Sequence, residues 1–415
     1  MTPPSLARRL GVRDAVVIGL AAMIGAGVFT VFAPAAAAAG GGLVIGLAIA
    51  AFVAFANASS TAQLAARYPE SGGAYRYGRE RLGAWPGFLA GWGFVIGKTA
   101  SCAAMAMTFA AYLVPSEWQR PLAAAAVIAL AGVNLRGITR TARAATIIVT
   151  FVVLVLLVVI TAGGSALLQR GIPLDGLLDA GWFGILQSAG LLFFAFAGYA
   201  RIATLGEEVR DPARTIPRAI SIAFACALVL YALVALVLLA TLGAPALAAS
   251  TAPLVDLVEA AGWPALAPVV RLAAAAAALG ALLALIAGIG RTALAMARDG
   301  ELPQPLASVH PRTRVPHVAE IVVAVVIVAL VLTVDLREAI GFSSFGVLGY
   351  YLVANLAALT QPAGERRVPR ALSAAGAIGC LVLVVTLPST SIIAGLVVFA
   401  VGVCWRLVTI ARRRR

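Results

Sequence analysis

The feature that most limits what this chain can fold into is a series of long apolar blocks. Stretches of about 18 or more apolar residues with few charges are typical of helices that cross a membrane. Twelve such blocks follow one another along the 415 residues, and the fourth is short. They lack the alternating pattern of membrane-barrel strands, so the sequence predicts an all-α integral membrane protein with about twelve transmembrane helices. The predicted helices cover residues 15–36, 43–64, 86–113, 122–133, 145–162, 182–206, 219–242, 265–290, 318–334, 339–359, 371–387 and 391–410.

The composition agrees with this class. Only 12% of the residues are charged, whereas a soluble domain of this size uses about 25% charged residues to cover its surface. The four cysteines lie inside predicted helices without metal-ligand or disulfide spacing, so we interpret them as small core residues. The two histidines flank one predicted loop, so we expect no metal site and no cofactor. The first apolar block is too long for a cleavable signal and lacks a cleavage site.

The net charge of +14 is distributed unevenly over the predicted loops. Every second loop and both termini are basic, while the opposite loops carry few arginines and several acids. This positive-inside pattern predicts cytoplasmic N- and C-termini in a multi-pass protein of the plasma (cytoplasmic) membrane. The charge therefore reflects topology and lipid contact, not a nucleic-acid groove. The basic segments contain Arg8, Arg9, Arg13, Arg67, Arg76, Arg79, Arg81, Arg136, Arg140, Arg143, Arg210, Arg214, Arg218, Arg298, Arg312, Arg314, Arg366, Arg367, Arg370 and residues 412–415.

The first predicted helix contains Gly25 and Gly27 near its middle. Two glycines this close weaken a helix and permit local unwinding. Unwound backbone is tolerated at membrane depth where it lines a cavity. There its free N–H groups, with the positive end of the next half-helix, can hold a carboxylate. Close packing of small residues against another helix is the alternative, and the glycines alone do not decide between the two.

The sixth predicted helix has a glycine at its midpoint, Gly198, with aromatic residues before it and a charge after it. Interrupted helices five apart indicate a transporter of two inverted repeats around a midplane site. The first repeat would be helices one to five, about residues 14–165, and the second helices six to ten, about residues 181–360. Residues 371–410 would form two accessory helices of the same single domain, which takes in residues 1–415.

Several short segments occur in order along the chain, each on an expected helix or cytoplasmic loop. They are residues 23–29 (MIGAGVF), 68–75 (YPESGGAY), 91–92, 193–198 (FFAFAG), 207–212 (EEVRDP), 216–219, 295–303 (AMARDGELP) and 309–313. Through these segments the sequence resembles the amino acid–polyamine–organocation (APC) superfamily over almost its whole length. The resemblance implies a fold with discontinuous helices one and six, alternating access, and a substrate of the α-amino-acid type.

The resemblance also implies which residues meet the substrate. Backbone N–H groups of residues 24–27 would bind its carboxylate, and carbonyls around Phe194, Ala195 and Ala197 would accept from its amino group. Phe194 would also be an aromatic gate, for which ordinary core packing is the alternative. The expected substrate-binding residues are Ile24, Gly25, Ala26, Gly27, Phe194, Ala195, Ala197 and Gly198.

Lys98, in the third predicted helix, is the only lysine in the sequence. A desolvated lysine can lose its proton whereas an arginine keeps it, so a membrane lysine is a reasonable proton carrier. Several proton-coupled relatives have such a lysine in helix five, and we expect Lys98 to take this coupling role from helix three. A structural amine held by backbone carbonyls, or one that reaches an interface, is the alternative. Sodium coupling is less expected, because Thr292 is the only hydroxyl where relatives supply several from helix eight.

Arg201 follows the position at which several relatives have an acid. If Arg201 faces the pathway, its charge disfavours a dicationic substrate. Pairing with an acid such as Glu207, as part of an inner gate, is an equally good interpretation.

The sequence thus predicts a permease, a secondary active transporter that couples to protons, and it favours a neutral over a charged amino acid as substrate. An amino acid/amine or polyamine exchanger is the alternative, but its pocket would normally offer carboxylates, and none lies near the midplane of helices one, three or six. An intramembrane enzyme would need a nucleophile–base pair or a metal cluster within the helices. A channel or a non-transporting amino acid sensor on the same fold stays open. The expected partners are a small-molecule amino acid and membrane lipids.

Overall fold

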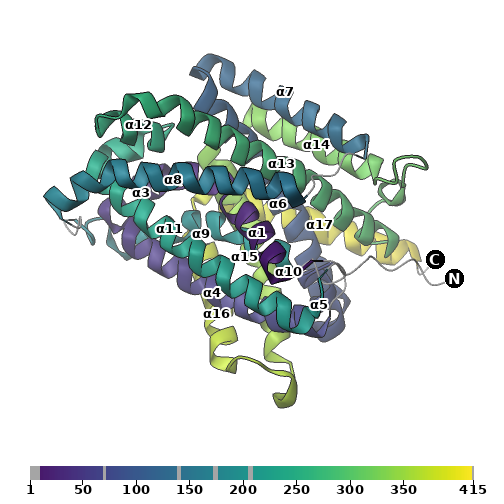
Figure 1. The fold of residues 1–415 in the computed structure, drawn as a ribbon. Helices are drawn as coiled ribbons and strands as arrows, with labels where there is room; N and C mark the ends of the chain where they lie inside the picture. Colours follow the sequence, from purple (N-terminus) through teal and green to yellow (C-terminus); the bar gives the residue numbers. More distant parts are fainter. Residues whose placement is uncertain (1–9, 69–71, 138–141, 172–175, 204–208, 414–415) are drawn as a thin grey trace.

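The computed structural model describes residues 10–68, 72–137, 142–171, 176–203 and 209–413. In these ranges the regular structure is helical and contains no strand (Figure 1). The helices are α1 Val12–Met23, α2 Gly27–Thr30, α3 Phe32–Ala39, α4 Leu43–Arg67, α5 Ala74–Leu82, α6 Ala84–Leu113, α7 Ser116–Leu135, α8 Ala142–Arg170, α9 Gly181–Phe196, α10 Ala200–Ala203, α11 Pro212–Ala249, α12 Pro253–Ala260, α13 Ala267–Arg298, α14 His317–Thr333, α15 Leu336–Leu359, α16 Arg370–Thr386 and α17 Ser389–Arg413.

Most of the predicted membrane helices are present. Nine helical runs of the described chain are long and apolar enough to cross a membrane, and α14 and α16 are shorter apolar helices. The remaining predicted block, residues 122–133, lies within α7, a 20-residue helix with Glu117 and Arg120 near its start. The all-helical, multi-pass class is therefore confirmed, while the total of twelve spans and the inverted repeat stay predictions.

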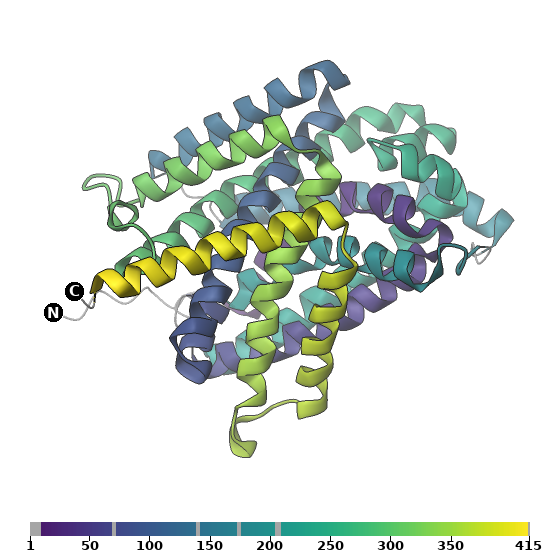
Figure 2. The ribbon, with the colours of Figure 1, turned by 180° about the vertical axis from the view of Figure 1, so that it is seen from behind.

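The helices pack closely through small residues. A Cβ atom on Gly97 of α6 would lie 3.0 Å from the carbonyl oxygen of Ser343 in α15, and one on Gly346 would lie 2.8 Å from the Cα of Gly97. Such close backbone approach is how helices associate in lipid. Figure 1 shows α1 between α8 and α11, with α9 behind them, and Figure 2 shows α15, α16 and α17 on the opposite side. Helices α1 and α9, the two that end at the predicted interruptions, therefore have other helices around them.

Several of the segments that the sequence predicted to be cytoplasmic meet at one end of the bundle. The segments in contact there are the end of α4, helix α5, the segment after α13, the turn between α15 and α16, and the start of α11. We call this region the basic end. The side-chain contacts that define it are Arg67–Glu365, Arg79–Glu301, Arg81–Thr360 and Arg367–Ala213.

Candidate binding site at two interrupted helices

The first interruption follows α1, which stops at Met23 before the chain resumes as α2. The N–H of Ile24 donates to the carbonyl of Leu20 at 2.7 Å and caps α1. The N–H groups of Gly25, Ala26 and Gly27 make no hydrogen bond to a backbone carbonyl of the described chain. The interruption predicted from the two glycines is therefore observed, and N–H groups of this kind can bind an anion.

The second interruption follows α9, which ends at Phe196 and continues as a 3-10 turn before the short helix α10. A Cβ atom on Gly198 would overlap the backbone of Ala22, and one on Gly27 would lie 2.8 Å from the Cα of Ala195. The glycines are thus needed for the two interruptions to lie against each other. Their contact brings the predicted binding residues of both helices to one place.

The carbonyl groups that were expected to accept from a substrate amine have protein donors in this structure. The Ala195 carbonyl accepts from the Tyr231 hydroxyl at 3.1 Å. The Ala197 carbonyl accepts from Nζ of Lys98 and from the Tyr351 hydroxyl, each at 3.3 Å. A ligand ammonium that used these oxygens would therefore displace, or share them with, a protein donor.

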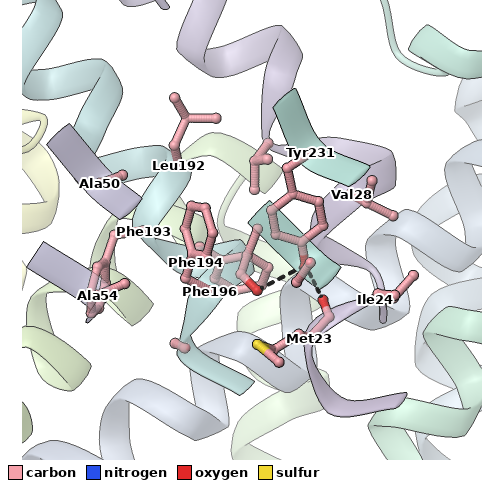
Figure 3. Close-up of a cluster of buried hydrophobic side chains, with 14 of the residues drawn as sticks. Met23, Ile24, Val28, Ala50, Ala54, Leu192, Phe193, Phe194, Phe196 and Tyr231 are labelled. Atoms are coloured by element: carbon pink, nitrogen blue, oxygen red, sulfur yellow. Dashed lines mark hydrogen bonds between the residues drawn. The ribbon is translucent and has the colours of Figure 1, made fainter. Parts of the chain in front are cut away.

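Buried tyrosines from the surrounding helices bond the backbone at both interruptions. Tyr231 of α11 donates to the Met23 carbonyl at 2.6 Å and to Ala195 at 3.1 Å, so it bridges the two (Figure 3). Tyr112 of α6 donates to the carbonyl of Phe29, just after the first interruption, at 2.8 Å. These tyrosines were not predicted from the sequence. Their signal was a phenol inside an apolar helix, since a buried hydroxyl needs a partner.

Phe194 is buried, with 8% of its surface exposed, in the aromatic cluster beside the interruptions (Figure 3). Its carbonyl accepts from the N–H of Ala197, which caps α9. The neighbouring Phe196 packs edge-on against Tyr231, with ring centroids 5.1 Å apart. This burial is compatible with a gate and with core packing, so the gate role of Phe194 stays a prediction.

Lys98 lies in α6 and is buried, with 8% of its surface exposed. Its ammonium reaches the second interruption, where it bonds Ala197. One turn along the helix, the Ser101 hydroxyl lies 2.6 Å from that of Ser343 in α15. In the described part of the chain no carboxylate lies within ion-pairing distance of Lys98. The lysine therefore meets backbone at the candidate site and does not extend to an interface.

Charge is scarce around the two interruptions. Among the described residues, the buried charged side chains are Lys98, Glu301, Glu320 and Arg406. Glu301 lies at the basic end, and Glu320 of α14 packs against Gly290 of α13, where an added Cβ would lie 2.8 Å from its Cγ. Of these four, only Lys98 bonds an interruption.

The other predicted site residues lie on α10, on α13 or outside the described residues. Arg201 is half-buried in α10, while Glu207 lies outside the described residues. The Thr292 hydroxyl donates to the Gly288 carbonyl of its own helix at 3.2 Å. Over the described residues, no group of three or more histidine, cysteine, aspartate or glutamate side chains is arranged to hold a metal ion.

Comparison with known proteins finds similarity over almost the whole chain. The sequence model of the amino acid permease family matches residues 14–398. An uncharacterised transporter of Mycobacterium tuberculosis is 57% identical over 401 residues, which cover 97% of this chain and 91% of the relative. The branched-chain amino acid permease BcaP of Bacillus subtilis is 26% identical, with coverage of 96% and 92%. Cationic amino acid transporter 4 of Homo sapiens is 28% identical, with coverage of 84% and 59%.

Proposed function

Because the chain belongs to the amino acid permease family, we propose that it is a secondary transporter that moves a neutral amino acid by alternating access, with coupling to protons. The observation that carries this proposal is the contact between the two interruptions. In this contact Gly27 packs against Ala195, and among the described residues the N–H groups of residues 25–27 have no backbone partner. A zwitterionic amino acid needs both kinds of group, donors for its carboxylate and acceptors for its ammonium.

A neutral side chain fits the charges at the site. Lys98 is the buried charge that bonds an interruption, and the buried acids of the described chain, Glu301 and Glu320, contact other elements. A second positive charge on the substrate would meet the lysine and, among the described residues, no buried carboxylate, which is unfavourable at low dielectric. The name of the Bacillus subtilis relative, a branched-chain amino acid permease, agrees with this substrate class. The human relative is named a cationic amino acid transporter, so basic amino acids are the alternative substrates to be compared.

Coupling to protons would act through Lys98. A protonated amine makes a charge-assisted hydrogen bond to the Ala197 carbonyl, whereas a neutral amine holds that oxygen weakly. The same carbonyl is one of those expected to receive the substrate ammonium. Proton binding to Lys98 and substrate binding would therefore influence each other through one oxygen atom. No cofactor is involved in this scheme.

The surrounding architecture would follow the same family plan. Helices one to five and six to ten would form two inverted repeats, and the last two helices would be accessory. The basic end would face the cytoplasm in the plasma membrane, with both termini on that side, as the positive-inside rule requires.

The decisive experiment is uptake by purified protein in proteoliposomes. Labelled neutral, acidic and basic amino acids are compared with and without an inward proton gradient. We expect uptake of a neutral amino acid that the gradient stimulates.

Each other outcome contradicts one part of the proposal. Uptake that requires unlabelled amino acid inside and ignores the gradient would indicate an exchanger. Preferred uptake of arginine or lysine would overturn the neutral substrate class. Absence of both uptake and counterflow for the whole panel would argue against an amino acid carrier and favour an amine substrate or a sensor.

A further inference from the structure

A second hollow, separate from the interruptions, lies on the outside of the bundle between α4 and α11. It encloses about 100 Å³. The part of the hollow that lies farther from the basic end is apolar and aromatic. Phe55 of α4 is 45% exposed there, and its ring centroid lies 5.9 Å from that of Phe224 in α11. An exposed aromatic surface on a membrane-embedded bundle is available to lipid.

The opposite part of this hollow is polar and positively charged. Arg367, from the turn between α15 and α16, closes it at the basic end. Its backbone N–H donates to Oε1 of Gln63 at 3.1 Å, and its guanidinium donates to the carbonyl of Ala213. These bonds attach the turn to both α4 and α11, so the arginine is held at the mouth of the hollow.

The lining residues follow a graded order along both helices. On α4, Gln63 lies at the basic end, Ser59 one turn deeper and Phe55 another turn deeper. On α11, Ser221 lies one turn and Phe224 about two turns in from Pro217. Eight residues of helix span about 12 Å. The lining of the hollow therefore changes from charged groups to hydroxyl groups and then to aromatic rings. This change takes place over roughly the length of a phospholipid headgroup, glycerol backbone and first methylenes.

Further arginines surround the charged part. Arg218 is exposed, and it lies three residues before Ser221, on the same side of α11. Nε of Arg366 is buried and has no hydrogen-bond partner among the described residues. The nearby carboxylate Glu365 is engaged by Arg67 at 3.3 Å. The mouth of the hollow therefore carries an excess of positive charge.

We propose that this hollow is a binding site for one anionic phospholipid. Its phosphate lies at Arg367 and Arg218, its ester groups at Ser59 and Ser221, and one acyl chain against the aromatic rings. An anionic headgroup is preferred over a zwitterionic one because the mouth offers arginines, whereas Glu365, the described carboxylate nearby, is paired with Arg67 through one oxygen and has its other oxygen buried.

The proposed lipid would also be close to the transport site. The ring of Phe224 lies 5.5 Å from that of Phe196, the last residue of α9 before its interruption. A lipid chain packed on Phe224 would therefore be separated from the interrupted helix by a single aromatic layer. Anionic lipid should thus alter transport as well as stability.

The test uses the full-length protein in detergent micelles, titrated with phosphatidylglycerol or with phosphatidylcholine of the same chains while thermal unfolding is followed. We expect phosphatidylglycerol alone to raise Tm in a saturable way. Arg218→Gln should raise the half-saturating lipid concentration about fivefold, which is the effect of losing one surface arginine near an anionic headgroup. The matched control is Arg312→Gln, which removes one exposed arginine from the loop before α14 and should respond like the unmodified protein.

Two further arms keep the proposal falsifiable. Ser221→Trp fills the hollow without removing a charge, and it should abolish the lipid response while leaving baseline Tm nearly unchanged. Inorganic phosphate, which lacks acyl chains, should fail to stabilise the protein. The proposal is overturned if phosphate stabilises as well as phosphatidylglycerol, if the two lipids act alike, or if Arg218→Gln and Arg312→Gln give the same titration.

Discussion

At the residue scale, the candidate site is made mostly of backbone, so its most sensitive positions are those with the smallest side chains. Gly198 is the clearest case, because a methyl group there would overlap the backbone of Ala22 and Met23. We predict that Gly198→Ala forces the two interruptions apart and reduces uptake by at least about tenfold, since a misplacement of about 1 Å can cost a hundredfold in a positioned site. Initial rates of uptake in proteoliposomes, normalised to protein content, measure this.

The matched control for that substitution is Gly288→Ala. Gly288 lies inside α13, and an added Cβ would meet no atom within 4 Å. Alanine should stabilise a helix interior by up to about 1 kcal/mol relative to glycine. Equal uptake by the two alanine variants would show that the close contact at Gly198 is not needed for transport.

Lys98 permits a prediction that separates charge from proton exchange. Lys98→Arg keeps a positive charge near the Ala197 carbonyl but cannot release a proton. We predict that this variant retains exchange of labelled for unlabelled amino acid and loses accumulation driven by a proton gradient. Lys98→Met should lose gradient-driven accumulation as well. Accumulation that survives in both variants would exclude Lys98 from coupling.

The two kinds of site residue differ in how far the sequence reveals them. Gly27 and Gly198 were predicted because a glycine in a membrane helix is a local signal of close approach or unwinding. Tyr231 and Tyr351 were missed, because which face of a helix meets an interruption depends on the rotation and packing of that helix. A sequence without those rotations cannot say which phenol bonds Met23 and which bonds Ala197.

At the element scale, α17 is fixed to the rest of the bundle by a buried charge cluster. Glu301, just after α13, accepts from Arg406 of α17 at 2.9 Å and from Arg79 of α5. The Trp405 indole donates to the Glu301 carbonyl at 3.0 Å. The Arg406 guanidinium also lies 4.7 Å from the ring centroid of Trp85, at the start of α6. The last helix is thereby joined directly to the segment after α13 and to α6, and through Glu301 to α5.

We predict that Arg406→Gln weakens this junction by about 1.5–3 kcal/mol, the usual contribution of a hydrogen bond to a charged group. Arg79 still balances Glu301 in this variant, so the protein should fold, but with a lower Tm in detergent. Arg412→Gln, an exposed position of the same helix, is the control and should leave Tm within error. A Tm unchanged by Arg406→Gln would mean that the cluster does not hold α17.

Element boundaries were predicted less well than element existence. The apolar block at residues 219–242 became part of the much longer α11, which includes a non-helical residue, Gly243 with φ 73°. Hydropathy marks where a helix meets lipid, whereas its polar ends are set by turns and by contacts with other segments. For the same reason the sequence located Glu301 in a loop but did not predict its pairing with Arg406, which lies 105 residues further along the chain.

At the scale of the whole molecule, the contacts at the basic end show that arginine-rich segments far apart in the sequence lie together. Segments far apart in the sequence, including the end of α4, helix α5 and the turn before α16, meet there through contacts such as Arg67–Glu365 and Arg79–Glu301. Charge pattern predicted that these segments share one side of a membrane, and the fold brings them together. Which side of the membrane that is depends on the positive-inside rule alone.

Labelling of single cysteines tests this orientation. In a chain whose four native cysteines are replaced by serine, Arg312→Cys places a thiol in the exposed loop before α14, and Trp263→Cys places one between α12 and α13, where the native side chain is 49% exposed. We predict that a membrane-impermeant maleimide labels position 263 in intact cells and position 312 only after permeabilisation. The two positions lie at opposite ends of α13, so they must give opposite results if that helix crosses the membrane. The reversed pattern would place the basic end outside the cell, and labelling of both positions in intact cells would mean that α13 does not span the bilayer.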